Sequence, residues 1–419
     1  MAEGPLAGVR ILEFGQVIAG NYAGVLLADM GAEVVKVESA AGDPARNPAV
    51  AELHGESALH LTVNRGKKSI VLDLKAPEGR QLFLDLVESA DAVLDNFRPG
   101  VLERLAIDYE HLRQINPAII SVSVSGFGQD GPARNRPAFD LVVQAFSGHM
   151  SITGEPGRDP VRMGAPMADL AGGMFGAMSV LAALVGRDRT GRGRRADVSM
   201  LDSLVSLLGY DATIYLNTGA QLGPQGNSNV HMVPWAAFPT SDGHVAITAR
   251  DDRYWRRLCQ AIDRPELAED PRCLTNADRV ANRDWVLAEL RTALAARTTA
   301  EWVGTLEAFD VPAGPVNDFA GVFADPQVVA RQLVQTYDDP TLGPVRHVAA
   351  PTRFDGWTPR PLPPPRLGEH TAEVLRDRLG LDDERIGDLV RRGIVLTAAE
   401  LADGEGAQPP VGAAAAPVV

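Results

Sequence analysis

Cysteine is almost absent from this chain, and so are the usual marks of secreted, metal-binding and membrane-spanning proteins. The 419 residues include only two cysteines, Cys259 and Cys273, which form neither a disulfide framework nor a metal-ligand spacing. No apolar run approaches the ~20 residues that span a bilayer, and residues 1–5 lack the basic and apolar regions of a signal peptide. We therefore expect a cytosolic protein that needs no metal or redox cofactor.

Positive charge is also in short supply. Forty Lys and Arg residues face 54 Asp and Glu residues, which gives a formal net charge of −14. This balance argues against nucleic acid as a partner. It is compatible with a small anionic ligand, provided that local arginines, lysines or helix N-termini supply positive potential.

Strand and helix signals alternate through the first 200 residues. Residues 9–14 predict a buried strand, and residues 21–31 predict a helix that ends at Gly31. Residues 77–90 predict another helix with Pro77 in its first turn. This alternation indicates an α/β fold with a largely parallel sheet covered on both faces. The other strands of the sheet are expected at residues 33–38, 69–75, 92–97, 118–125 and 196–200.

The composition changes after about residue 210. Residues 219–229 are rich in glycine, glutamine and asparagine, which predicts a loop, and the proline-rich run 359–365 predicts an extended connector. One strand and three helices between these two segments indicate a smaller mixed domain. They are expected at residues 244–249, 253–261, 284–296 and 300–309, and two further helices at 371–379 and 382–392.

Asp169 is the only ionisable residue between Arg162 and Arg187. It precedes an apolar helix that carries glycines at 172, 173 and 176. Aspartate is favoured at helix N-termini, so capping is the simplest interpretation and a chemical role is the alternative. Each glycine costs the helix about 0.5–1 kcal/mol against alanine. Their number indicates that something approaches the helix backbone closely.

Residues 95–104 follow a predicted strand and carry an amide, an aromatic ring and two arginines. Ligands of open α/β sheets bind at the carboxyl ends of the strands, where this segment would suit a nucleotide-like anion. The alternative is a polar loop whose two arginines are solvated.

Residues 126–131 match the pattern GxGxxG and also follow a strand. A dinucleotide-binding fingerprint needs a helix to begin at that turn, and Pro132 and Pro137 disfavour one. The chain contains no P-loop and no G-x-S-x-G nucleophile elbow.

Motifs spread over nearly the whole chain resemble those of the class III CoA-transferase family, which includes formyl-CoA, succinyl-CoA and carnitine CoA-transferases. Each motif is short, and their order along the chain carries the resemblance. They are Ala19-Gly20, GAEVVKVE at 31–38, KSIVLDLK at 68–75, DNFRPG at 95–100, SGFG at 125–128, Asp169 with its glycines, TGRGR at 190–194, GPVN at 314–317 and GEHT at 368–371.

The resemblance implies a Rossmann-like large domain built from residues 1–205 and 335–400, which binds CoA. A small α+β domain at 225–330 is inserted between these parts, after a linker at 206–224. Two such chains form interlocked rings in this family, which implies a homodimer. The tail at 403–419 is rich in alanine, proline and glycine and is expected to be disordered.

The resemblance also implies that Asp169 is a nucleophile. Its carboxylate would attack an acyl-CoA thioester and carry CoA as an enzyme aspartyl thioester, which an acceptor acid then takes over. Backbone N–H groups near Gly172 and Gly173, or across a glycine loop, would stabilise the oxyanions. CoA enters as a substrate rather than as a resident cofactor.

The residues that the resemblance assigns to CoA lie in several segments. Phosphate groups suit the four basic residues among them, which are Lys75, Arg98, Arg104 and Arg136. The sequence departs from formyl-CoA transferase at Ile18, Ser39 and Pro137, and residues 219–229 lack its tetraglycine run. The assigned residues are Ile18, Ala19, Leu72, Lys75, Asn96, Phe97, Arg98, Arg104, Arg136 and Asp140.

The same family resemblance includes α-methylacyl-CoA racemases, which shuttle a proton between Asp169 and a histidine. That histidine falls at Phe139 here, and phenylalanine cannot exchange a proton. A non-catalytic acyl-CoA-binding protein is the third alternative. We expect a CoA-transferase that acts between an acyl-CoA, with succinyl-CoA the reasonable donor, and a small free carboxylic acid.

Overall fold

The computed structural model describes residues 3–49 and 51–403 of the chain. Contacts divide it into two compact units. The first contains the described residues of Met1–Gly148, Met163–Tyr210 and Gln332–Val419, and the second contains His149–Arg162 and Asp211–Arg331. The domain boundaries expected near residues 205, 225 and 335 stay a prediction. The expected disordered tail lies outside the described residues, except for Asp403, which ends the last helix.

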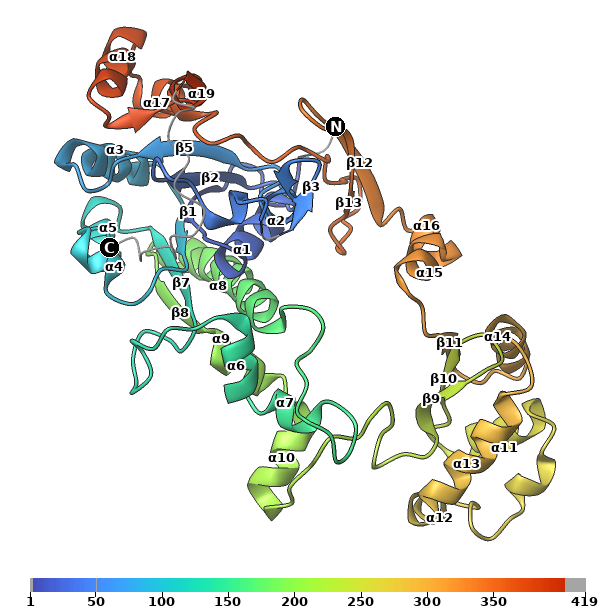
Figure 1. The fold of residues 1–419 in the computed structure, drawn as a ribbon. Coiled ribbons are helices and arrows are strands. Elements are labelled where there is room, and N and C mark those ends of the chain that lie inside the picture. The colour runs from blue at the N-terminus through green and yellow to red at the C-terminus, as the bar shows by residue number, and fades with distance from the viewer. Residues whose placement is uncertain (1–2, 50, 404–419) are drawn as a thin grey trace. The chain divides into compact units, whose positions relative to one another are not determined.

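A seven-stranded sheet forms the centre of the first unit (Figure 1). The chain starts in its middle, moves outward over three strands, returns to the other side of the first strand and moves outward again. This is the order of a doubly wound sheet. It confirms the predicted α/β fold with a largely parallel sheet. The parallel strands, in spatial order, are β5 (Lys68–Leu72), β2 (Glu33–Glu38), β1 (Arg10–Phe14), β6 (Ala92–Asp95), β7 (Ile120–Ser125) and β8 (Arg195–Ser199).

Neighbouring residues of β1 pack into different hydrophobic cores. Ile11 belongs to the core on one face of the sheet and Leu12 to the core on the other, because successive side chains of a strand point to opposite faces. Helices therefore cover both faces. One core is completed by α1 (Ala19–Ala28), α8 (Met167–Thr190) and α9 (Met200–Ser206), and the other by α3 (Pro77–Glu88), α5 (Tyr109–Ile115), α17 (Thr371–Leu379) and α18 (Asp383–Arg391).

Several element ends differ from the predicted ones, and β5 shows why. The strand expected at 69–75 ends at Leu72, because Asp73 makes a turn in which its carboxylate accepts the Lys75 N–H. Shorter elements complete this unit. They are η1 (Pro44–Arg46), β3 (Glu52–Leu53), β4 (Glu56–Ser57), α2 (Ala58–Val63), α4 (Val101–Arg104), α6 (Asp140–Phe146), β12 (Val334–Asp339), β13 (Gly343–Val348), β14 (Val395–Leu396), which pairs antiparallel with β5, and α19 (Ala398–Asp403).

Helix α8 is long and apolar enough, by length and composition alone, to cross a membrane. The sequence expectation of no such run is therefore not met by α8, whose uncharged stretch begins after Asp169. In the structure α8 packs as a core helix against α1, β7 and α9. Its glycines permit this contact, since a Cβ on Gly173 would lie 2.7 Å from the carbonyl oxygen of Ala19. The close approach that the glycines predicted is therefore made by the protein itself.

The second unit has its own core around a three-stranded antiparallel sheet. Cys259 and Cys273 are buried in that core, and burial raises the pKa of the Cys259 thiol to about 12. Regular structure is absent from residues 219–229 except for one bridge at Ser228. The elements of the second unit are α7 (His149–Ile152), most of α10 (Gly209–Thr218), β9 (Trp235–Pro239), β10 (His244–Thr248), α11 (Asp252–Ala261), η2 (Pro265–Ala268), α12 (Asn276–Ala281), α13 (Arg283–Leu294), α14 (Thr299–Ala308), β11 (Ala313–Pro315), α15 (Phe319–Ala324) and α16 (Pro326–Ala330).

Candidate active site

Asp169 is the third residue of α8 and does not cap the helix. The position before the helix is Pro166, which has no N–H, so a side chain at Asp169 cannot reach back to an N-cap donor as it would in a capping box. None of the described residues donates a hydrogen bond to its carboxylate. Burial, with the nearby negative charge of Asp140, raises the pKa of Asp169 to about 7. The capping interpretation is wrong, and Asp169 is instead a partly buried carboxylate without a hydrogen-bond donor among the described residues.

Asp140 takes over the capping of α8. Its Oδ1 accepts the Ala168 N–H at 2.8 Å, and its Oδ2 accepts the side-chain amide of Gln144 at 2.6 Å. The Oε1 of Gln144 in turn accepts the Met163 N–H at 2.8 Å. Asp140, the first residue of α6, therefore accepts a backbone N–H from the first turn of α8. Through Gln144 it is also linked to Met163, in the segment that precedes α8. Sequence reasoning missed Gln144, whose signal was one amide inside the apolar helix DLVVQAF.

Gly172 and Gly173 do not form the predicted oxyanion site. Both lie beyond the first turn of α8, where backbone N–H groups are used by the helix itself. Both are buried. Their missing side chains make room for Met200 and Val124 in one case and for α1 in the other. The oxyanion interpretation is therefore wrong for these two residues.

The segments assigned to CoA follow strands of the sheet, at its carboxyl edge. Helix α8 crosses from β7 back to the parallel strand β8, so its N-terminus and Asp169 begin at that same edge. The order of the strands reverses between β1 and β6, and ligands of doubly wound sheets bind at this switch point. Ile18 and Ala19 follow β1 there, and the segment Asn96–Arg98 follows β6.

Asn96 joins the two loops of the switch point. Its Oδ1 accepts the Gln16 N–H, and its Nδ2 donates to the Gln16 carbonyl, each at 2.8 Å. The side-chain amide is thus engaged by the protein's own backbone. Asp95, just before it, is buried, and burial raises its pKa to about 6. The Asp95 carboxylate accepts the Phe97 N–H at 3.1 Å and so fixes the backbone of the loop at Phe97.

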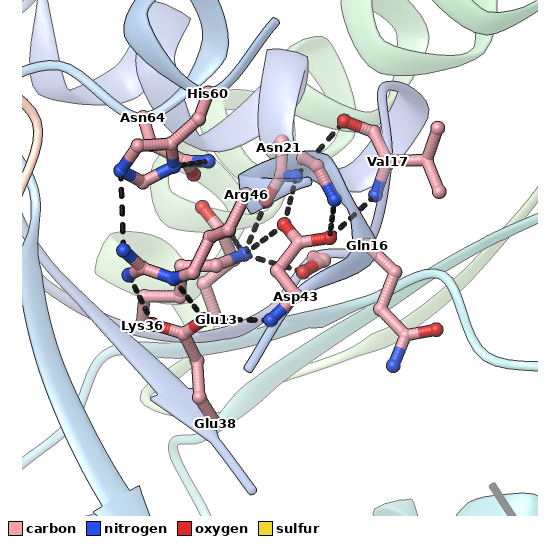
Figure 2. A network of polar contacts seen from close by, with 12 residues as sticks. Glu13, Gln16, Val17, Asn21, Lys36, Glu38, Asp43, Arg46, His60 and Asn64 are labelled. Carbon is pink, nitrogen blue, oxygen red and sulfur yellow. Dashed lines mark hydrogen bonds and ion pairs between the residues drawn. The ribbon is translucent and has the colours of Figure 1, made fainter. Parts of the chain in front are cut away.

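A buried polar network holds the loop after β1 (Figure 2). Val17 has a φ of +58°, which is costly for a β-branched residue. Asp43 accepts the Val17 N–H at 3.0 Å, and the amide of Asn21 donates to the Val17 carbonyl at 3.0 Å. The side chain of Gln16 points away from the network in Figure 2. The strained backbone at Val17 is therefore held by hydrogen bonds from Asp43 and Asn21.

Four charges lie at the base of that network. Lys36 forms ion pairs with Asp43 at 2.9 Å and Glu13 at 3.4 Å, and Lys67 pairs with Glu13 at 2.7 Å. Burial opposes the charged form of Lys36, but the surrounding carboxylates outweigh it and raise its pKa. Burial lowers the pKa of Lys67 to about 8. The sequence signal that we missed was a lysine and a glutamate inside the apolar strands EVVKVE and ILEF.

The other residues assigned to CoA lie along the same edge with varying exposure. Phe97 and Arg98 line a small hollow with Asp95 and Arg195. Lys75 is exposed after β5, whereas Leu72 is buried at the end of that strand. Arg104 ends α4 and is exposed, and Arg136 is exposed with its guanidinium over the ring of Phe146.

Phe139, at the position of the racemase histidine, is 71% exposed and precedes α6.

Comparisons with known proteins agree on one family. The model of CoA-transferase family III matches residues 6–371. Human succinyl-CoA:glutarate CoA-transferase is 37% identical over 393 residues, which cover 93% of this chain and 90% of that protein. Succinyl-CoA:mesaconate CoA-transferase of Haloarcula hispanica is 39% identical over 390 residues, covering 89% and 96%. A crystal structure of a CAIB/BAIF family protein from Brucella suis superposes with a TM-score of 0.80 at 35% identity, covering 90% and 100%.

Proposed function

This chain belongs to CoA-transferase family III, and from that premise we propose a covalent mechanism on Asp169. The chain is a CoA-transferase that acts between an acyl-CoA and a carboxylic acid. The observation that carries the proposal is the Asp169 carboxylate itself. It is partly buried, it has no hydrogen-bond donor among the described residues, and it lies in the first turn of the helix at the carboxyl edge of the sheet.

In the first half of the reaction, an Asp169 oxygen attacks the thioester carbon of the donor. The carbon–sulfur bond breaks, and CoA leaves as a thiolate while an acyl–aspartyl anhydride forms. The thiolate then attacks the aspartyl carbonyl carbon, which expels the donor acid as a carboxylate and leaves an aspartyl–CoA thioester. Two moderate steps thus replace one difficult exchange.

In the second half, the acceptor carboxylate attacks the aspartyl thioester and again displaces the CoA thiolate. The thiolate attacks the acceptor's carbonyl carbon in the new anhydride, which releases acyl-CoA and regenerates the Asp169 carboxylate. No proton is gained or lost overall. Because the attacking group must be ionised, the rate of the first half rises as the pH increases through about 7.

Succinyl-CoA is the proposed donor and a small dicarboxylic acid the proposed acceptor. The two named relatives support this choice, since both have succinyl-CoA in their names and glutarate or mesaconate as the second partner. CoA would lie along the switch point, where Arg98 and the loop after β1 meet, with Lys75, Arg104 and Arg136 available for its phosphates. The two loops joined by Asn96 provide a fixed wall for it.

We also propose that the chain forms a homodimer through the outer face of α8. Met174, Met178 and Val185 are 39%, 59% and 54% exposed, and their spacing of four and seven residues places them on one side of the helix. Exposed apolar patches of this kind mark interaction surfaces.

The experiment that tests the covalent mechanism is mass spectrometry after incubation with succinyl-CoA alone. We expect a CoA adduct on the peptide that contains Asp169, which hydroxylamine removes. Asp169→Asn should lose both the adduct and turnover, whereas Asp188→Asn, at an exposed carboxylate in the same helix, should keep both. Normal turnover by Asp169→Ala, or an adduct elsewhere, would refute the mechanism. A library of carboxylic acids added to the loaded enzyme then identifies the acceptor.

A further inference from the structure

We propose that Asp140 is a positioning residue that binds the N-terminus of α8 in place of Asp169 and leaves the Asp169 carboxylate without hydrogen bonds, and that it does not serve as a ligand of CoA. This inference rests on the proposed nucleophilic role of Asp169. It differs from the assignment of Asp140 to CoA that the family resemblance implies. Two observations support it. Both carboxylate oxygens of Asp140 accept hydrogen bonds inside the protein, and the backbone donors near Asp169 are either absent or already used.

Both carboxylate oxygens of Asp140 are engaged inside the protein. One accepts the Ala168 N–H at 2.8 Å and the other accepts the Gln144 amide at 2.6 Å. Gln144 is fully buried, and it is held in turn by the Met163 N–H at 2.8 Å. A carboxylate fixed from both sides in this way is suited to hold a helix N-terminus, which explains its place at the start of α6 without a ligand.

The consequence for Asp169 is the loss of the contacts that an acidic residue in a first helical turn normally makes. The N-cap position is Pro166, which offers no N–H, so the backward bond of a capping box is impossible. The next donor, the Ala168 N–H, is already taken by Asp140. Hydrogen bonds to a carboxylate stabilise its charged form and lower its pKa, so Asp169 is left without that stabilisation.

Asp140 also places a like charge beside Asp169. The titratable groups on the elements packed against α8 are few, and Asp140 is the one whose charge acts on Asp169, adding to the effect of burial. A like charge disfavours the ionised form of its neighbour. A more basic carboxylate is the better nucleophile once it is ionised. The groups on these elements are Tyr22 on α1, Asp140 on α6, Arg195 and Asp197 on β8, and Asp202 on α9.

The test is the pH profile of Asp169, measured in two ways. One is the single-turnover rate of adduct formation from succinyl-CoA. The other is labelling of Asp169 by a water-soluble carbodiimide and an amine, followed by peptide mass spectrometry. This labelling reports the protonation of Asp169 independently of any catalytic role. For Asp140→Asn we expect both midpoints to fall by about half a pH unit or more, and the plateau rate at high pH to drop about twofold, as a Brønsted slope near one half gives for half a pKa unit.

A double variant separates charge from hydrogen bonding. When Asp140→Asn is combined with Gln144→Glu, the new amide at position 140 can donate to the new carboxylate at position 144, whose other oxygen accepts the Met163 N–H. The bonding pattern is kept while the negative charge moves from position 140 to the fully buried position 144. We expect a lower thermal midpoint than in the wild type, because that charge is buried without an ionic partner, together with a lowered pH midpoint. Asp202→Asn, at an exposed acid on α9, should change neither.

Three outcomes would overturn the inference. A raised KM for succinyl-CoA with unchanged pH midpoints in Asp140→Asn would assign Asp140 to CoA. Restoration of the wild-type pH midpoint by the double variant would make the hydrogen bonds, and not the charge, responsible. Equal shifts in Asp202→Asn would make the effect nonspecific. If the wild type formed no adduct but the labelling midpoint still fell in Asp140→Asn, the coupling would stand and the nucleophilic role of Asp169 would fail.

Discussion

Asn96 is bound to both backbone groups of Gln16, and this reciprocal pair joins the loops after β1 and β6 at the switch point of the sheet. We expect Asn96→Asp to raise the KM for acyl-CoA about tenfold with a smaller change in kcat. The aspartate side chain can still accept the Gln16 N–H, but it cannot donate to the Gln16 carbonyl, so the loop after β1 is held less firmly. The Gln16 carbonyl, which is partly buried, would lose its donor at a cost of about 1 kcal/mol, which a urea titration would show as lower stability.

The matched control for Asn96 is Asn217→Asp, because the amide of Asn217 bonds only within the exposed surface of α10. It should leave the KM and the stability near their wild-type values. A large loss of kcat at unchanged KM in Asn96→Asp would show that the amide acts on the reacting atoms and does not position the loop.

Asp169 should make the protein less stable at the pH where it works. Its pKa of about 7 in the folded chain exceeds the ordinary value near 3.9 of an unfolded aspartate, so the folded state binds more protons between these values. Stability of the wild type therefore falls as the pH rises from 4 to 7. Asp169→Asn lacks this loss and should be more stable than the wild type at pH 8, by roughly 2–4 kcal/mol.

Urea unfolding of the wild type and Asp169→Asn at pH 5 and pH 8 measures that difference. The advantage of the variant should be smaller at pH 5, because the Asp169 carboxyl of the folded wild type is still protonated there and most of the loss of stability occurs between pH 5 and pH 7. An advantage that stays constant with pH would mean that the pKa of the Asp169 carboxyl is not raised in the folded chain.

Lys36 should be far more important for stability than Lys68, although the two lysines both form ion pairs. The Lys36 side chain is fully buried between Glu13 and Asp43, and removal of one partner from such a site leaves charge buried without compensation, at a cost of about 3–5 kcal/mol. Lys68 is 32% exposed in its pairs with Glu33 and Glu373, where ion pairs contribute about 0–1 kcal/mol. Denaturant titrations of Lys36→Met and Lys68→Met compare them, and similar losses would argue against the network.

The sheet was predictable because its strands are short apolar runs separated by helical patterns. Residues 33–38 and 371–379 were predicted to the residue, as β2 and α17. The capping of α8 was not predictable, since Asp140 lies 28 residues from Ala168 and no local pattern connects them. The same holds for Asn96 and Gln16, which are 80 residues apart. Local spacing identifies which residues are unusual, and tertiary contacts decide what they do.

Two glycines of α8 should respond to alanine in opposite directions. A Cβ on Gly173 would lie 2.7 Å from the Ala19 carbonyl oxygen and 3.0 Å from Tyr22, so Gly173→Ala must push α1 away, at about 1–3 kcal/mol for an overpacked core. A Cβ on Gly186 would meet nothing within 4 Å. Gly186→Ala should stabilise the helix by about 0.5–1 kcal/mol. Thermal denaturation distinguishes them, and stabilisation by both would mean that α1 and α8 are loosely packed.

Met178 tests the proposed homodimer. It is 59% exposed in the middle of the apolar outer face of α8, and an interface there would bury it. Met178→Asp would then place a charge in a dry contact, which costs several kcal/mol of association, so the chain should elute as a monomer in size-exclusion chromatography with light scattering. Ala182→Asp, one turn further along the same exposed face, should have the same effect, whereas Asp188→Asn, which adds no charge to that face, should leave the dimer intact. A wild type that is monomeric at micromolar concentration would exclude the dimer, and a dimer that persists in Met178→Asp would place the interface elsewhere.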